Sequence, residues 1–389
     1  MTWYDNTIAF YGEQSQAVDA GWINEFLGTF LTYAGPAHGV HDYRKVKKTK
    51  SGLLDFDFSV GALPSPQSRP LVVGLIADWG CGNLAAQRVM EELKKQNPDI
   101  VIHLGDTYYS GTKMEQVEYF LKLAQDILGK DVPIFNIPGN HDYYSGGEGF
   151  MHVIDELRGT QHVGQEASYF TLRGEHFQII GLDTGLLDSF QLNSIAAKLP
   201  LGDAWQSMNR NTLPFLPEDQ LQWALKQIET GRRNGLKTIL LSHHQLFSRK
   251  ESLGYANGVV REAAFDLDVR AGVYETRQWE KKSEDLPGHL KESESPAANT
   301  RLLDQFPPEV LKDVTAWFWG HEHGMSLYEE YANLKRGRLI GNACIPVPKR
   351  PLWDQYGVNN NSVTKPWGGK HPEIITGSKV GEGKFFWNM

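Results

Sequence analysis

The chain has 389 residues, of which 40% are hydrophobic, so it is long enough to bury a sizeable core in one large or two modest domains. Its formal net charge of −8 argues against a nucleic-acid backbone as its main partner. The two cysteines, Cys81 and Cys344, are too few for a disulfide framework and lack the spacing of a zinc site, and by default Cys81 is a small buried thiol.

The first residues, MTWYDNTIAFYGEQ, lack a charged segment followed by an apolar one, so we expect no signal peptide. No apolar run approaches the ~18 residues needed to cross a membrane. These observations predict a soluble, cytoplasmic protein without a membrane span.

The N-terminal third divides into an extension and the start of an α/β pattern. Residues 1–69 mix aromatic residues with a basic cluster and end in the Pro/Ser-rich stretch ALPSPQSRP, so we expect an N-terminal extension that packs on the next domain. From residue 71, strand patterns (LVVGLIAD, IVIHLGD, VPIFNIPGNHD) alternate with helical ones (NLAAQRVMEELKKQNPD, MEQVEYFLKLAQDIL). Such alternation is typical of an α/β domain.

The pattern continues in the second half of the chain. SYFTLRGEHFQIIGLDT predicts two strands joined at Gly174, PEDQLQWALKQIETGRR a helix, and LKTILLSHH and DVTAWFWGHEH two further strands. Residues 247–298 exceed what one helix and one strand require, so we expect an insertion whose first half walls the site and whose polar second half is exposed and mobile. We place the catalytic domain at residues 70–350 and a C-terminal tail at 351–389.

Five of the predicted strands end in residues that can bind metal ions, in the motifs IADWG, LGDTYY, PGNHD, LSHH and WGHEH. Sites in α/β sheets form at strand ends, and glycines let the backbone turn so that the next side chain points into a cleft. Each motif alone has a simpler explanation as a turn or as a histidine satisfied in the core. All five together, in this order, favour a metal site.

These motifs resemble those of the calcineurin-like metallophosphoesterase superfamily over roughly residues 71–346. Asp78-Trp79-Gly80 lacks the histidine that many members carry in the first motif, and Gly105-Asp106 is followed by a tyrosine, Tyr109. Both features are similar to the purple acid phosphatase branch. The resemblance implies an α/β fold, a four-layer αββα sandwich of two mixed β-sheets flanked by helices, with metals at the strand ends.

The resemblance also implies a set of metal ligands around two ions bridged by Asp106. The first ion would take Asp78, Asp106, Tyr109 and His323, and the second would take Asp106, Asn140, His243 and His321. Because a phenolate suits a ferric ion, Fe(III) is expected beside Tyr109, with a divalent Fe, Zn or Mn ion next to it.

Four further residues near the motifs have expected roles. His141 would stabilise the phosphoryl oxygens or protonate the leaving group. Asp142 would orient His141 or satisfy backbone amides, and His244 would support a ligand or touch the substrate. Tyr108, which alternates away from Tyr109, is expected to pack in the core.

We therefore expect a binuclear metal-dependent phosphoester hydrolase acting on a small phosphoester substrate. A phosphomonoesterase, similar to acid phosphatases, is the first hypothesis, and a phosphodiesterase acting on cyclic nucleotides or other small diesters is the alternative. A non-catalytic scaffold of the same fold is disfavoured because every expected ligand position is filled. The native metals and the oligomeric state stay open.

Overall fold

The computed structural model describes residues 70–108, 111–143, 146–161, 165–186, 214–248 and 297–344. It also describes residues 372–373 and 375, and the backbone of 55–57, 260–268 and 273–281. Tyr109, most of the expected N-terminal extension and C-terminal tail, and much of the 247–298 insertion lie outside the described residues. The predicted wall and mobile half of that insertion therefore stay predictions.

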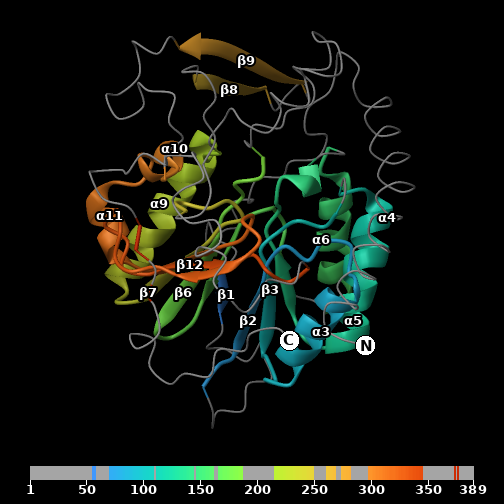
Figure 1. The fold of residues 1–389 in the computed structure, drawn as a ribbon. Coiled ribbons are helices and arrows are strands. Elements are labelled where there is room, and N and C mark those ends of the chain that lie inside the picture. The colour runs from blue at the N-terminus through green and yellow to red at the C-terminus, as the bar shows by residue number, and fades with distance from the viewer. Residues whose placement is uncertain are drawn as a thin grey trace, which may run out of the picture.

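Two sheets form the centre of the molecule (Figure 1). The smaller sheet has the order β2-β3-β4 and is parallel, with strands Val73–Ile76, Ile100–His103 and Ile134–Asn136. The seven-stranded sheet has the order β1-β5-β6-β7-β10-β12-β11 and mixes parallel with antiparallel pairs. Its strands are Asp55–Asp57, Phe170–Arg173, Phe177–Gly181, Lys237–Leu241, Val314–Trp319, Gly337–Ile340 and Met325–Leu327.

The two sheets pack face to face through one apolar layer. This layer contains side chains from both sheets: Ile100, Ile102, Phe135, Leu172, Ile179 and Leu241. The rings of Phe135 on β4 and Phe170 on β5 have centroids 5.3 Å apart, which shows the direct contact between the sheets. Successive residues of β3 point to opposite faces, so Val101 packs against helices while its neighbours pack against the other sheet. A strand covered on both sides explains why these segments are apolar without interruption.

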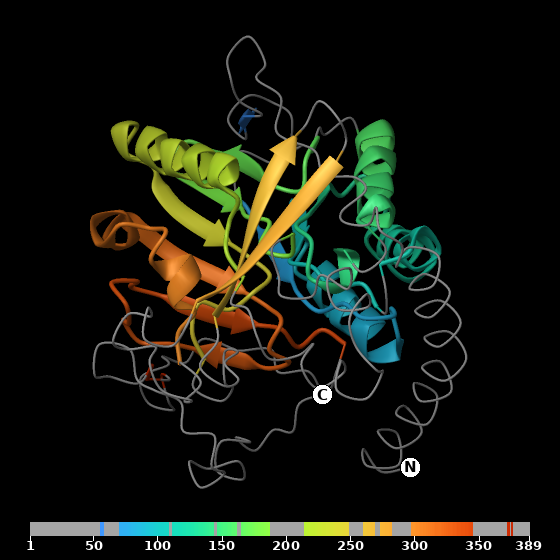
Figure 2. The ribbon, with the colours of Figure 1, turned by 90° about the horizontal axis from the view of Figure 1, so that it is seen from above.

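Helices cover both outer faces, as Figure 2 shows from above. The small sheet is covered by α3 (Leu84–Lys94), by α6 (Glu148–Gln161) and by a continuous helical stretch between them. This stretch consists of α4 (Lys113–Glu115), the π-helical segment η2 (Gln116–Leu121) and α5 (Lys122–Leu128). On the large sheet lie α9 (Glu218–Arg233), α10 (Thr300–Leu303) and α11 (Pro308–Asp313). The layers confirm the expected αββα sandwich.

The helix α3 shows how local sequence sets these boundaries. The Asn83 side chain accepts a hydrogen bond from the backbone N–H of Ala86 at 3.0 Å and so caps the helix start. The helix ends at Lys94, and Asn97 then takes a left-handed conformation with φ 49° just before Pro98.

The expected strands and helices are confirmed in the described residues, including the β5–β6 hairpin closed at Gly174. Elements that were not expected from the sequence are α6, the π-helical turn of η2, and the strands β11 and β12. Within the insertion, β8 (Val260–Asp268) and β9 (Val273–Lys281) pair as an antiparallel hairpin. None of the helices in the described part of the chain is long and apolar enough to cross a membrane.

Candidate metal centre

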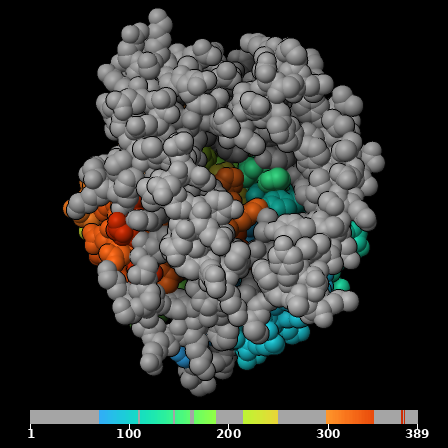
Figure 3. Space-filling model, viewed as in Figure 1, coloured from blue at the N-terminus to red at the C-terminus, as the bar shows by residue number. Residues whose placement is uncertain are grey.

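The five strand-end motifs meet between the two sheets. Asp78, Asp106 and Asn140 follow β2, β3 and β4 of the small sheet, and His243 and His321 follow β7 and β10 of the large one. Backbone hydrogen bonds tie these turns together, from Asp78 N–H to the Gly105 carbonyl at 3.0 Å and from Gly320 N–H to the His243 carbonyl at 2.9 Å. Figure 3 shows atoms from the green and orange parts of the chain side by side near the centre of the view.

Three of these residues have a strained backbone. Asp78, Asp106 and His321 have φ angles of 58°, 71° and 66°, in the left-handed region that residues with a Cβ atom rarely adopt. Such a conformation costs of order 1–3 kcal/mol and is typically kept where it aims a side chain at a functional site. Here it turns each side chain away from the sheet and toward a common point.

Two motif glycines leave the space that the carboxylates occupy. A Cβ atom on Gly139 would lie 2.1 Å from Oδ1 of Asp106, and one on Gly320 would lie 2.4 Å from Oδ2 of Asp78. Both distances are far below any van der Waals contact. The glycines of PGNHD and WGHEH are therefore required by the position of the neighbouring carboxylates as well as by the turns.

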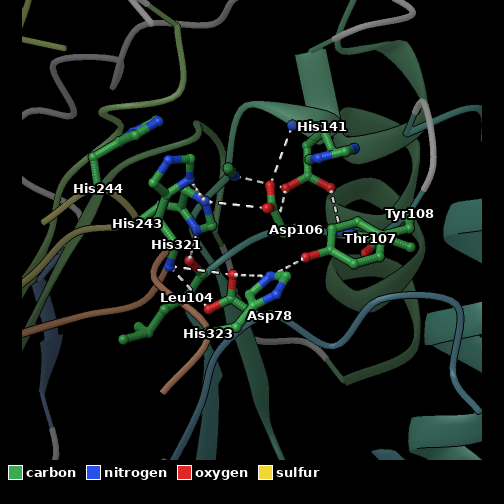
Figure 4. A network of polar contacts seen from close by, with 12 residues as sticks. Asp78, Leu104, Asp106, Thr107, Tyr108, His141, His243, His244, His321 and His323 are labelled. Carbon is green, nitrogen blue, oxygen red and sulfur yellow. Dashed lines mark hydrogen bonds and ion pairs between the residues drawn. The ribbon is translucent and has the colours of Figure 1, made fainter. Parts of the chain in front are cut away.

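The centre of the site is a group of three buried side chains, Asp78, Asp106 and His243, whose ligand atoms lie within 4.8 Å of one another (Figure 4). His243 Nε2 lies 3.3 Å from Oδ2 of Asp106 and 3.2 Å from Nδ1 of His321. His243 Nδ1 donates to the Leu104 carbonyl at 2.8 Å, because a carbonyl only accepts. In the neutral imidazole this bond leaves the Nε2 lone pair facing the carboxylates, as metal-binding histidines require.

Asp78 forms a second side of the centre with His323. The Nε2 atom of His323 lies 3.7 Å from Oδ1 of Asp78, while both Asp78 oxygens accept the backbone N–H of His321 at 3.1 and 2.9 Å. The expected residues thus fall into two groups, with His323 beside Asp78 and His243 beside Asp106. This arrangement fits two neighbouring cations.

The electrostatics of the protein without metal also indicate a cation site. Burial raises the pKa of Asp78 to about 7, and the Asp106 carboxylate adds to this increase. Burial lowers the pKa of His243, but the Asp106 carboxylate outweighs it and raises that pKa to about 10. The paired His243 charge correspondingly lowers the pKa of Asp106 against the effect of burial. Two desolvated carboxylates with one imidazolium between them are a set of donors that a divalent or trivalent cation can complete.

The Asp142 carboxylate joins the LGDTYY and PGNHD motifs through hydrogen bonds. Its Oδ2 accepts the backbone N–H groups of Asp106 at 2.9 Å and Gly139 at 2.6 Å, and its Oδ1 accepts that of Thr107 at 3.1 Å. The Gln116 side chain, at the start of the π-helical segment, donates to the same carboxylate. Of the two roles expected for Asp142, the structure therefore shows the satisfaction of backbone amides.

His141 and Asn140 lie next to this carboxylate. The His141 backbone N–H donates to Oδ1 of Asp106 at 3.1 Å, so the turn that carries the imidazole is fixed to the centre. The ring of His141 is half-buried and its centroid lies 4.5 Å from that of Tyr108. Asn140 is buried directly before it.

His244 lies beside the centre and is held by Thr184, a residue that was not expected in the site. The hydroxyl of Thr184 lies 3.0 Å from both the backbone nitrogen and Nδ1 of His244. The His244 ring centroid lies 4.5 Å from that of His321, and the two form a further candidate group with His243. Thr184 had a detectable signal, because it follows the apolar strand β6 in GLDT as the other site residues follow theirs.

Tyr108 corrects the expectation that it only packs. Its side chain is 7% exposed, but its hydroxyl lies 2.5 Å from Nε2 of His323 and so belongs to the site. The expectation was wrong because it assumed that side chains alternate between the two faces of a strand as far as Tyr108. The strand β3 ends at His103 and the backbone turns at Asp106, so this alternation no longer applies at Tyr108.

Comparisons with known proteins assign the chain to a class and a family. A model of the calcineurin-like phosphoesterase family matches residues 71–325, well over half of the chain, and this range contains every site residue described above. The protein is a metal-dependent phosphoester hydrolase. It belongs to the calcineurin-like phosphoesterase family.

Two solved structures are similar to the chain at low identity. A dimetal phosphatase from Danio rerio is 12% identical, with a TM-score of 0.43, and the similarity covers 72% of this chain and 90% of that one. The protein TT1561 of Thermus thermophilus is 8% identical, with a TM-score of 0.34, over 70% of this chain and 90% of that one. No curated protein sequence matches the chain. The assignment therefore rests on the family match.

The position of Asp106 generates a first prediction. Asp106→Asn should abolish hydrolysis and sharply reduce the metal content, because the neutral amide cannot supply negative charge to two cations. Metal per chain would be measured by plasma mass spectrometry on the purified protein, with circular dichroism to establish the fold. Asp99→Asn is the matched control. Asp99 lies just before β3, at the opposite end of the strand from Asp106, and its Oδ2 accepts a hydrogen bond from the backbone N–H of Val72. An Asp106→Asn protein with two metals and near-full turnover would contradict the bridging role.

Proposed function

We propose that the protein is a phosphomonoesterase that uses two metal ions, bridged by Asp106, to hydrolyse small phosphate esters. The observation that carries this proposal is the convergence of Asp78, Asp106 and His243, from both sheets, at one buried point where their ligand atoms lie within 4.8 Å. The first ion would be held by Asp78, Asp106, Tyr109 and His323, and the second by Asp106, Asn140, His243 and His321. Bound there, the metals would supply a water of lowered pKa and neutralise charge on the phosphoryl oxygens.

The protein's own side chains would position the ester and handle the proton. His141 is fixed to Asp106 through its backbone, yet its ring is half-buried and accessible, which suits a group that meets the substrate. Its imidazolium would bind a phosphoryl oxygen and donate the proton that the leaving alkoxide needs. The ring of Tyr108 packs beside it, with the two ring centroids 4.5 Å apart.

The preference for monoesters and for a ferric ion is drawn from two motifs. Asp78-Trp79-Gly80 and Gly105-Asp106-Thr107-Tyr108-Tyr109 are similar to those of purple acid phosphatases, in which a tyrosine replaces the histidine missing from the first motif. The Tyr108 hydroxyl, 2.5 Å from Nε2 of His323, adds one phenol beside the residues proposed for the first ion. A hard anionic phenolate stabilises Fe(III) relative to divalent ions, and the second position would take a divalent Fe, Zn or Mn ion.

A substrate panel tests the reaction class. The protein as purified, with its metals quantified, would be given p-nitrophenyl phosphate, bis-p-nitrophenyl phosphate, a cyclic nucleotide and a phosphotriester. We expect kcat/KM to be at least about tenfold higher for the monoester than for either diester, a difference of about 1.4 kcal/mol in transition-state binding. The reverse order would identify a phosphodiesterase, and no hydrolysis by protein holding two metals would identify a scaffold.

The role of His141 gives a second prediction, measured on a series of aryl phosphates whose leaving groups differ in acidity. His141→Ala should keep both metals and lose turnover by a factor of about 10² to 10⁴, because general acid catalysis is typically worth this much. The loss should shrink for aryl phosphates with acidic leaving groups, which need little protonation. His176→Ala is the control, since that side chain is 81% exposed at the β5–β6 turn. Equal losses of turnover for all leaving groups would indicate that His141 binds the phosphoryl oxygens and does not donate a proton. Loss of metal from His141→Ala would exclude both roles.

The two adjacent tyrosines allow a matched test of the ferric site. Iron-loaded protein should show a broad visible absorption from phenolate-to-iron charge transfer, and Tyr109→Phe should abolish it. Tyr108→Phe removes the hydrogen bond to His323 and should keep the band. Absorption that disappears only in Tyr108→Phe would move the ligand role to Tyr108. Colourless, fully active protein with only divalent metal would contradict the ferric assignment.

A further inference from the structure

The chain's two cysteines, far apart in sequence, lie against each other in the fold. Cys81 follows the first motif on the loop after β2, and Cys344 ends the described segment after β12. Their thiols make a side-chain hydrogen bond, and neither cysteine is in a disulfide. Cys344 is only 1% exposed, whereas Cys81 is half-buried and reaches the surface.

Close packing around Cys344 holds this pair in place. A Cβ atom on Gly80, which has φ 66°, would lie 2.3 Å from Sγ of Cys344, so the sulfur sits directly on the loop backbone. The Asn83 side-chain amide donates to the same Sγ at 3.0 Å while its oxygen caps α3. The Cys344 sulfur is therefore held against the backbone of the loop that carries Cys81.

The loops that carry the cysteines also carry the metal centre. Gly80 N–H donates to the Asp106 carbonyl and Tyr108 N–H donates to the Gly80 carbonyl, both at 3.0 Å. On the other side, Ala343 N–H donates to the Ala77 carbonyl at 3.3 Å. Asp78 therefore shares the loop that carries Cys81, and this loop is hydrogen-bonded to the loop that carries Cys344.

We propose that Cys81 and Cys344 are a redox modification site that a peroxide converts reversibly into a disulfide, and that this cross-link weakens metal binding at Asp78. The peroxide would oxidise the accessible Cys81 sulfur to a sulfenic acid and leave as one water. The Cys344 thiol would then attack that sulfur, form the S–S bond and expel a second water. Two thiol hydrogens and two electrons thus pass to one peroxide molecule, and a dithiol reductant returns them.

The effect on the metal centre follows from the distance that the sulfurs must travel. Two hydrogen-bonded thiols must approach to about 2.05 Å to form a disulfide. The Cys344 sulfur lies against the backbone of Gly80, so a covalent bond from Cys344 to Cys81 would pull on this loop, whose hydrogen bonds hold Asp106 and Tyr108. Metal sites tolerate displacements of only about 0.5 Å. This second step rests on the proposed two-metal centre, whereas the disulfide itself does not.

Peptide mapping tests the disulfide without any activity measurement. The full-length protein, as purified with its metals, would be treated with hydrogen peroxide, alkylated and digested with trypsin without reduction. We expect a cross-linked pair of the peptides 51–88 and 339–349, which disappears after dithiothreitol treatment. Cys81→Ser and Cys344→Ser should each lack it. Peroxide that carries Cys81 to sulfinic or sulfonic acid, with Cys344 still alkylated, would overturn the proposal.

Metal analysis of the same samples tests the link to the site. Oxidised wild-type protein should lose at least about half of one metal equivalent per chain after gel filtration and regain it after reduction and reloading, whereas both serine variants should keep their metal under peroxide. Cross-linked protein with unchanged metal content would overturn the coupling. Because the mapping does not require turnover, a protein that hydrolyses no ester can still show the disulfide, and the two proposals fail separately.

Discussion

The structure depends on holding two carboxylates, Asp78 and Asp106, close together where water does not reach them. Both are almost fully buried, so their repulsion is little screened and each has lost most of its hydration. In the protein without metal, the imidazole of His243 lies beside Asp106 and compensates its charge. Burial raises the pKa of Asp78, which favours the neutral, protonated form of that carboxyl group. A site of this kind is unfavourable to build unless a cation offsets the desolvation, and for this reason it is evidence of metal binding.

The surrounding chain is organised to keep that arrangement from relaxing. Left-handed backbone at Asp78, Asp106 and His321 stores strain that only dense neighbouring contacts can maintain. Asp142 supplies much of this support by accepting three backbone N–H groups from two different motifs. The π-helical turn that begins at Gln116 adds a side-chain donor to the same carboxylate, in keeping with the frequent occurrence of such turns near functional sites.

Much of the fold and the candidate ligands could be predicted from sequence because one rule governs both. Strands covered on both faces are continuously apolar, so a polar residue such as Asp106 stands out where the strand ends. Residues such as Tyr108 and Thr184 were missed because their roles depend on contacts between segments far apart in the chain, His323 in one case and His244 in the other. The helix α6 was missed because its apolar face is defined by the helices and sheet that it covers. The pairing of Cys81 with Cys344 has the same origin in tertiary structure.

The division of the site between the two sheets has a consequence for biosynthesis. The small sheet and its helices are complete by residue 161, and they already contain Asp78, Asp106 and Asn140. The histidines expected as metal ligands come later, and the last of them, at 321 and 323, follow β10 of the other sheet. A ribosome-bound chain therefore exposes its acidic motifs long before it can surround an ion. The full set of residues is assembled only once the second sheet has docked on the first, and a chain interrupted between the sheets would leave its carboxylates without the imidazoles that compensate them.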